Sequence, residues 1–386
     1  MLNLLPKNMF IKIKIILLIF LFVFCNSNIF CQSNRTIFPD TTNKNIDFSL
    51  KNEINHTIEL GLKWLLKQQE KNGSWQFDPA ITSLVLSSFL RYNSVFTFKD
   101  SFIYAGFDYL KKCIKNDGGI YLKDLPNYTT SISLMAFKDA SNNIEFNKII
   151  SNAENFLIGL QYDEDKGYTK DSLYYGGVDY GNGKSPDVSN LQWAIEALHY
   201  KETYNIEQKS DEKSKKKKLY YDNALIFLTK CQNLKSVNKE SYSADDGGFM
   251  YAPGKSKAGG TLSYGSMTYA GLKSMIYLKV DKNDKRIKAA YNWVKNNYSV
   301  TENSGLGEQG LFYYYHTFSK SLSAFGEDKV IDSKGITHNW RVELAEYLIK
   351  IQNEEGWWQN QNARWWENNK VLVTAYCILS LEELLI

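Results

Sequence analysis

The feature that most constrains this chain is a two-helix pattern that recurs along almost its whole length. In each copy, an amphipathic helix is followed by a glycine-containing turn and then by a helix that is apolar nearly all round. In the first copy Ile54, Ile58 and Leu62 share one helix face, Gly73 ends the segment, and the apolar helix follows at 81–90. Further amphipathic helices lie near residues 107, 153, 221, 287 and 340, and their apolar partners are expected at 129–137, 189–199, 266–278, 317–325 and 371–384.

Six such pairs favour two concentric layers, because the amphipathic helices need water on one face and the apolar helices need cover on all faces. The sequence therefore predicts an all-α fold, an α/α toroid of six helical hairpins over residues 54–386. An open solenoid of stacked hairpins is the alternative. The sequence lacks alternating β-branched runs joined by hairpin turns, so no large sheet is expected.

The N-terminus has the pattern of an export signal. Lys7, Lys12 and Lys14 precede an apolar run at 15–24, and small or polar residues follow it. The run is short for a membrane span. We therefore expect residues 1–33 to be a signal peptide, residues 34–53 a polar linker, and the mature protein to be periplasmic or extracellular. An uncleaved signal that anchors the chain is the less favoured alternative.

Charge and composition restrict the partners. The 46 basic and 42 acidic side chains leave a net charge of +4, and much of the excess lies in the leader and in the lysine run 213–218. The folded body is thus near neutral, and no nucleic-acid partner is expected. Aromatic residues make up 15% of the chain and must occupy a core, a cavity or an interface. We expect a small-molecule partner, and we keep peripheral membrane association as an option.

Two of the turns share a Gln-x-x-x-Gly-x-Trp motif. It reads Gln69 to Trp75 in the first copy and Gln352 to Trp358 in the last, and a looser third match pairs Gln161 with Gly167. The motif resembles the QW repeat of squalene and oxidosqualene cyclases. A glutamine at a helix end can bind exposed backbone groups, while the tryptophan packs over the turn and ties neighbouring hairpins together.

A second resemblance is to the β-subunits of protein prenyltransferases. Gly247-Gly248-Phe249 and Ala270-Gly271-Leu272 are similar to their GGF and AGL segments, and Tyr315-His316-Thr317 is similar to their YHT, whose histidine binds zinc. The chain has Leu262 and Tyr264 where that family has Asp-x-Cys. We therefore expect no metal or other cofactor.

Both resemblances imply the α/α toroid superfamily of terpenoid cyclases and prenyltransferases. The overall pattern is most similar to exported bacterial prenyltransferase/squalene-oxidase repeat proteins, whose activity is generally unassigned. The DxDD motif of squalene-hopene cyclases and the DCTAE motif of oxidosqualene cyclases are both absent. The resemblance thus implies the fold more strongly than an activity.

Candidate site residues cluster just before the apolar helices. If those helices run parallel in a ring, their N-termini converge on one mouth, which would suit a diphosphate, sulfate or carboxylate. The catalytic candidates are Asp179 as the preferred acid, Asp187, which could also cap the helix at 189–199, and His316, which matches YHT. The substrate-binding candidates are the aromatic residues Tyr174, Tyr175, Tyr264, Tyr269, Tyr313, Tyr315, Trp365 and Trp366.

Three functions remain open from the sequence. The chain could bind or cyclise an isoprenoid in an aromatic cavity, where ring faces stabilise carbocations. It could instead be an exported polysaccharide lyase or hydrolase, or a toroid that binds without catalysis. The polarity of the cavity distinguishes them, since a deep apolar pocket favours a lipid and a wide charged cleft favours a glycan.

Overall fold

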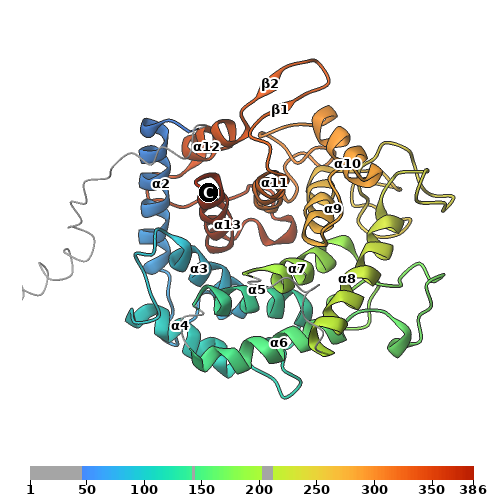
Figure 1. Ribbon diagram of the computed structural model, residues 1–386. Coiled ribbons are helices and arrows are strands. Elements are labelled where there is room, and N and C mark those ends of the chain that lie inside the picture. The colour runs from blue at the N-terminus through green and yellow to red at the C-terminus, as the bar shows by residue number, and fades with distance from the viewer. Residues whose placement is uncertain (1–45, 141–143, 202–211) are drawn as a thin grey trace, which may run out of the picture. The chain divides into compact units, whose positions relative to one another are not determined.

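In the described part of the chain, twelve α-helices alternate between an outer and an inner layer (Figure 1). The outer helices are α2 (Phe48–Leu66), α4 (Ser101–Lys112), α6 (Asn147–Gly159), α8 (Glu212–Cys231), α10 (Lys285–Asn296) and α12 (Trp340–Ile351). The inner helices are α3 (Pro79–Arg91), α5 (Pro126–Asp139), α7 (Val188–His199), α9 (Gly265–Tyr277), α11 (Leu311–Phe325) and α13 (Lys370–Leu384). Short 3₁₀ helices η1 (Ile144–Phe146), η2 (Glu164–Lys166) and η4 (Arg364–Trp366) and strands β1 (Val330–Ile331) and β2 (Thr337–His338) lie in the connections.

The structure is a computed structural model that describes residues 46–140, 144–201 and 212–386. The expected signal peptide, residues 1–33, and residues 34–45 of the expected linker lie outside the described residues. Helix α2 begins at Phe48 and so takes in the last part of the segment expected to be a linker. Asp47 caps this helix, because its side chain accepts a hydrogen bond from the Leu50 N–H.

The two layers close into a ring. Each inner helix packs against the next, from α3 through α5, α7, α9 and α11 to α13, and α13 packs back against α3. The outer helix α12 likewise contacts α2, so the last hairpin meets the first (Figure 1). This confirms the predicted α/α toroid and excludes the open solenoid.

Burial follows the apolar patterns of the two kinds of helix. Helix α10 buries one stripe, Ile287, Ala290, Trp293 and Val294, whereas α13 buries every residue except Lys370 and Glu383. The inner helices form the hydrophobic core, and the outer helices shield it from water. None of the described helices is both long and apolar enough to cross a membrane.

A glutamine at the end of an outer helix links neighbouring hairpins. The Gln69 amide donates to the carbonyl of Gly73 in its own turn (2.9 Å) and to that of Phe102 in α4 (2.8 Å). The Gln352 amide does the same with Gly356 and with Thr57 of α2, at 2.9 Å each, and so joins the ends of the ring. One amide thus ties a carbonyl of its own turn to a carbonyl within the neighbouring outer helix, and so links the two hairpins.

The structure corrects the third copy of this motif and adds a fourth. Gln161 binds the carbonyls of Gly176 and Tyr220, so its partner is Gly176 and not the expected Gly167. Gln232 binds those of Gly247 and Arg286 in the same way. In both copies a longer turn separates the glutamine from its glycine, which hides the spacing in the sequence.

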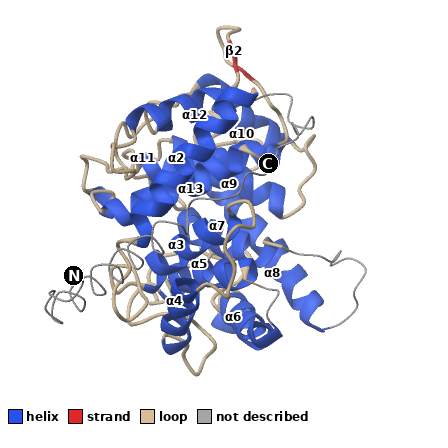
Figure 2. Cartoon of the chain, turned by 90° about the vertical axis from the view of Figure 1, so that its left-hand side faces the viewer, coloured by secondary structure: helices blue, strands red, loops and turns tan. Residues whose placement is uncertain are grey.

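Two connections differ from expectation. Helix α11 begins at Leu311, six residues before the expected start at 317, so its aromatic run lies inside the helix. Strands β1 and β2 form a two-residue antiparallel ladder, with Val330 opposite His338. Figure 2 shows this hairpin protruding from the edge of the ring beyond α12.

Substitution of a turn glycine should lower the free energy of unfolding. Gly356 has a φ of +102°, and an added Cβ would lie 2.4 Å from the Leu60 carbonyl oxygen in α2. We expect Gly356→Ala to lower the free energy of unfolding by a backbone cost of about 1–2 kcal/mol plus an overpacking cost of about 1–3 kcal/mol. Denaturant unfolding followed by circular dichroism measures the change.

Gly335→Ala is the matched control, because Gly335 has a φ of +79° but open space around its Cβ position. It should show the backbone cost alone. Equal losses of stability in the two variants would contradict the close approach of the Gly356 turn to α2.

Candidate functional site

A cavity of about 260 Å³ lies inside the ring at the N-terminal ends of the inner helices. The first two turns of α5, α7, α9, α11 and α13 contribute Tyr128, Ser189, Asn190, Trp193, Ser266, Met267, Tyr313, Leu372 and Tyr376. The loops that lead into these helices add Leu125, Tyr180, Tyr251, Lys257, Tyr264, Trp365, Trp366 and Glu367. Five of the six inner helices therefore present the same end to one hollow.

Aromatic rings form much of the cavity wall. The hydroxyl groups of Tyr128 and Tyr376 are hydrogen-bonded at 2.9 Å, and Trp193 meets Tyr128 edge-on with ring centroids 5.7 Å apart. The Tyr313 hydroxyl contacts Ser189 Oγ at 3.1 Å and accepts from the Gln192 amide at 3.2 Å. These contacts fix the rings in place around an apolar space.

The helix N-termini around the cavity already have acceptors. The Asp187 side chain caps α7 through the Asn190 N–H (2.8 Å), and the Asn303 side chain accepts from the Ser266 N–H of α9 (2.9 Å). Asn369 accepts from two N–H groups of α13. Protein acceptors thus satisfy these buried N–H groups, and the mouth does not offer them to a diphosphate or sulfate in the way the converging helices suggested.

Glu367 is the one carboxyl group among the described residues that line the cavity. Its Oε1 accepts from the Tyr313 N–H (2.8 Å), and its Oε2 accepts from the Phe312 N–H (3.3 Å) and the Asn360 amide (2.7 Å). It therefore caps α11, whose N-cap residue Gly310 has no side chain.

Burial sets the acidity of this group. The side chain is 1% exposed, and desolvation raises the pKa of Glu367 to about 7 although the hydrogen bonds from the α11 N–H groups oppose this shift. A substantial fraction of Glu367 is therefore protonated at neutral pH. Glu367 was not among the residues predicted from the sequence. Gly310 has no side chain to cap α11, which indicates that another acceptor is needed but not which residue supplies it.

Asp187 does not line the cavity itself, but its hydrogen-bond partners do. Its Oδ2 accepts from the Tyr251 hydroxyl and the Asn190 amide, both at 2.8 Å, and both of these residues line the cavity. Burial raises the pKa of Asp187 to about 6, against the lowering effect of these hydrogen bonds. The residue is both a helix cap and a member of the site's outer polar network.

The structure places Asp179, the preferred acid of the sequence analysis, outside the cavity wall. Its Oδ1 accepts from the Gly181 N–H at 2.7 Å and so holds a turn, while its buried Oδ2 has no hydrogen-bond partner among the described residues. Tyr180, the next residue, lines the cavity instead. Glu367 accordingly replaces Asp179 as the candidate proton donor.

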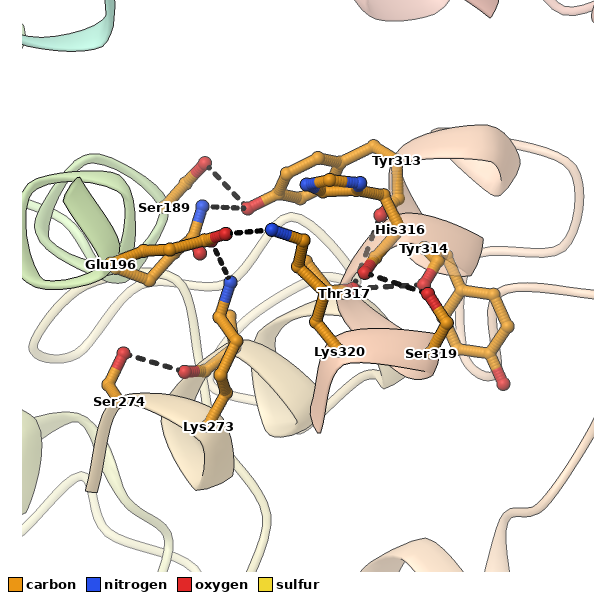
Figure 3. Close-up of polar contacts among 12 residues, drawn as sticks. Ser189, Glu196, Lys273, Ser274, Tyr313, Tyr314, His316, Thr317, Ser319 and Lys320 are labelled. Carbon is orange, nitrogen blue, oxygen red and sulfur yellow. Dashed lines mark hydrogen bonds and ion pairs between the residues drawn. The ribbon is translucent and has the colours of Figure 1, made fainter. Parts of the chain in front are cut away.

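His316 lies on α11 between Tyr313, which lines the cavity, and Lys320 (Figure 3). Its ring stacks on Trp193 with centroids 5.3 Å apart, and it lies 5.4 Å from the ring of Tyr376. Neither ring nitrogen has a hydrogen-bond partner among the described residues. Burial, with the charge of Lys320 second, holds the pKa of His316 well below its usual value, so the ring is neutral and packs as an aromatic group.

A buried ion cluster lies one helical turn beyond His316 along α11. Glu196 of α7 accepts hydrogen bonds from Lys273 of α9 and Lys320 of α11 (Figure 3). The exposed side-chain fractions are 2% for Glu196, 0% for Lys273 and 5% for Lys320. The two lysines hold the pKa of the Glu196 carboxyl well below its usual value, although burial alone would raise it. The cluster joins three neighbouring inner helices.

The aromatic candidates divide into two groups. Tyr264, Tyr313, Trp365 and Trp366 line the cavity. The other four lie elsewhere: Tyr175 donates to Glu164 and Asn223, Tyr315 donates to the Val300 carbonyl, Tyr269 packs edge-on against Tyr314, and the Tyr174 hydroxyl accepts from Ser185. Tyr128, Trp193 and Tyr376 also line the cavity but were not predicted to do so. The sequence of an inner helix does not distinguish an aromatic residue in the core from one that lines a cavity.

Solved structures with a similar fold include type II terpene cyclase MstE from Scytonema. The structure with geranylgeranyl dihydroxybenzoate, described as the substrate, has a TM-score of 0.52 and 12% identity, and the match covers 88% of this chain and 99% of that chain. The structure with merosterolic acid A, described as the product, has a TM-score of 0.51 and the same identity and coverage. The chain has the terpenoid cyclase-like α/α toroid fold.

A glycosidase structure is also similar, with a TM-score of 0.48 and 12% identity over 88% of this chain and 99% of that chain. No protein-family model and no curated protein sequence matches this chain. Within the described part of the terpenoid cyclase-like toroid, no group of three or more His, Cys, Asp or Glu side chains is arranged to hold a metal ion.

The ion cluster gives a test of what holds the inner ring together. Glu196→Gln leaves two buried lysines without a counter-ion, and we expect it to lower the free energy of unfolding at pH 7 by about 3–5 kcal/mol. The difference from the unsubstituted protein should shrink as the pH falls below 4.5, the usual pKa of the group. The reason is that the unfolded state then takes up a proton that the folded carboxylate does not, which removes the advantage of the native Glu196.

Asp108→Asn serves as the control, because it removes the exposed Lys112–Asp108 pair on α4 (2.6 Å). Such pairs contribute about 0–1 kcal/mol. Similar small effects of both substitutions in urea unfolding would refute the role of the buried cluster.

Proposed function

We propose that this protein binds an isoprenoid in its central cavity and cyclises it by proton transfer from Glu367. The observation that carries the proposal is a buried carboxyl group with a pKa of about 7 that faces an aromatic cavity. The terpene cyclase MstE, which has a similar fold, was solved with a geranylgeranyl compound as its substrate. That similarity supports a prenyl ligand for this toroid.

The chemistry follows from the two properties of the cavity. The protonated carboxyl would transfer its proton to a carbon–carbon double bond, which leaves a carbocation on the neighbouring carbon. A second double bond would attack this cation and close a ring, and loss of a proton from an adjacent carbon would restore a neutral product. The faces of Trp193, Tyr313 and Tyr376 would stabilise the cation, and the product would be an isomer of the substrate.

Protonation fits this site better than ionisation of a diphosphate. A leaving diphosphate needs free N–H donors or a metal, and the caps provided by Asp187, Asn303 and Glu367 already occupy the N–H groups of three converging helices. The apolar wall likewise favours an isoprenoid over a polysaccharide, whose many hydroxyl groups need polar partners.

A toroid that binds without catalysis is the second candidate. Its support is that both Glu367 oxygens already accept hydrogen bonds, so capping α11 alone would account for this residue. The ligand would be the same in both cases. The two candidates differ only in whether a proton leaves Glu367.

We also propose that the face around the cavity mouth contacts a membrane, from which an apolar ligand would enter. Phe77, Leu122 and Leu262 are 60%, 50% and 62% exposed, and each lies in a loop that leads into an inner helix at this face. Trp365 and Trp366 add 43% and 61% exposed rings at the mouth. Export of the chain through its N-terminal signal would place this face at the outer surface of a membrane.

Glu367→Gln tests the proton-transfer step. Incubation with geranylgeraniol followed by gas chromatography–mass spectrometry should give an isomeric product with the unsubstituted protein, and we expect the rate to fall at least 100-fold in the variant. Binding, followed by tryptophan fluorescence, should change less than threefold. Because the acid form is needed, the rate of the unsubstituted protein should fall about tenfold per pH unit above pH 7.

The exposed Glu308, whose backbone carbonyl binds Asn360 close to Glu367, provides the control Glu308→Gln, which should keep full activity. Binding without product in the unsubstituted protein would support the non-catalytic candidate. Unchanged turnover in Glu367→Gln would remove this residue as the acid.

The membrane proposal has its own test. The double variant Leu122→Glu/Leu262→Glu should bind phosphatidylcholine vesicles at least tenfold more weakly in a co-sedimentation assay, because a charge at the interface opposes burial of the loops. Ile331→Glu is the control, since Ile331 is 56% exposed but lies in the β1–β2 hairpin after the C-terminal end of α11. Equal binding of all three proteins, or none by the unsubstituted protein, would reject the membrane contact.

A further inference from the structure

A second hollow of about 460 Å³ lies beside the cavity mouth, between the end of α2 and the loop that leads into α13. We call it the tryptophan groove. Trp64, Gln68, Gln76, Trp366, Asn368 and Asn369 line most of it. Trp366 also lines the central cavity, so the two hollows share one wall.

The groove combines aromatic rings with side-chain amides. Trp366 is 61% exposed and Trp64 is half-buried, so each ring presents an apolar surface to the groove. The amide of Asn369 donates weakly to the amide oxygen of Gln76 at 3.5 Å, and both Gln76 and Asn368 are exposed. The Asn369 oxygen already caps α13. The other three amide groups of the groove each carry both a donor and an acceptor, which matches a hydroxyl group that needs to donate and accept.

The groove has a single charged side chain in its described lining, Lys370. No carboxyl group belongs to its described lining, and its one cation, Lys370, has its ammonium 3.6 Å from the ring centre of Trp357. A cationic ligand would therefore find no opposite charge there, and an anionic ligand would find only Lys370, which already lies over the ring of Trp357. A neutral polar ligand with an apolar face suits it best.

Strained backbone surrounds this groove. Gln76 and Phe77 have φ of +58° and +52°, and Trp365 and Trp366 have φ of +56° and +64°. Side chains other than glycine rarely adopt this conformation, and it persists only where the surroundings enforce it. The two loops that flank the groove thus hold a glutamine and two tryptophans in exposed positions at a conformational cost.

We infer that the tryptophan groove binds a pyranose ring carried by the ligand whose apolar chain occupies the cavity. One face of a pyranose consists of C–H groups and packs on an indole ring, while its hydroxyl groups are turned outward to hydrogen-bond the amides. Without a carboxyl group the groove can recognise the sugar but supplies no acid or base for its hydrolysis. The substrate class is then a neutral isoprenoid glycoside. This inference rests on the proposed function in one respect, which is that the apolar chain of the ligand occupies the central cavity.

Affinity measurements with three probes test this inference on the full-length mature protein. Isothermal titration calorimetry with geranylgeranyl β-glucoside, geranylgeraniol and methyl β-glucoside separates the sugar from the chain. We expect the glucoside to bind at least tenfold more tightly than the alcohol. Gln68→Ala and Gln76→Ala should each remove most of this difference and leave the affinity for the alcohol unchanged, whereas Gln361→Ala, exposed and outside the groove, should change neither.

The outcomes separate the two proposals. Equal affinities of the glucoside and the alcohol for the unsubstituted protein, or an equal loss for both in Gln76→Ala, would overturn the sugar site. Binding of methyl β-glucoside that depends on Gln76, without binding of geranylgeraniol, would keep the sugar site and reject the isoprenoid cavity. Trp366→Ala should weaken both ligands, because this ring belongs to both walls.

Discussion

The toroid depends on the close approach of the turns to the backbone of the next outer helix, which a glycine permits at five of the six described seams. The glycines at these turns have positive φ, and a Cβ on any of them would collide with a carbonyl oxygen across the seam. The pairs are Gly73 with Ala105, Gly118 with Asn152, Gly176 with Asn223, Gly247 with Ala289, and Gly356 with Leu60. The last pair closes the ring, and closure is what brings the N-terminal ends of the inner helices around one cavity.

Much of this fold could be predicted because it rests on local patterns. The spacing of apolar residues distinguishes helices with one buried face, such as α10, from helices buried on all faces, such as α13. The Gln–Gly turn could be recognised only where it is short; Gln232 and Gly247 are too far apart in sequence to show it. The start of α11 was misplaced for a related reason, since its capping carboxyl comes from Glu367, 54 residues further along the chain.

The candidate site was only partly predictable. Tyr264 and Tyr313 could be found from their position before or at the start of an inner helix, and Asp187 from its capping pattern. The sequence could not exclude Asp179 as the acid or identify Glu367 as the acid. Burial decides which carboxyl faces an apolar space, and burial results from the whole ring. His316 matched a zinc-binding motif, yet the surrounding Trp193, Tyr376 and lysines make it a neutral packing group.

The proposed chemistry depends on the fold through Glu367. Closure of the ring and the aromatic wall bury this carboxyl group, and burial favours its protonated form. The most direct measurement is the titration of this carboxyl by ¹³C NMR on protein labelled at glutamate side chains, with Glu367→Gln to assign the signal. We predict a resonance that titrates near pH 7 and disappears in the variant. A Glu367 signal that titrates near 4.5, the usual glutamate value, would show a solvated carboxylate and contradict a buried acid in a closed cavity.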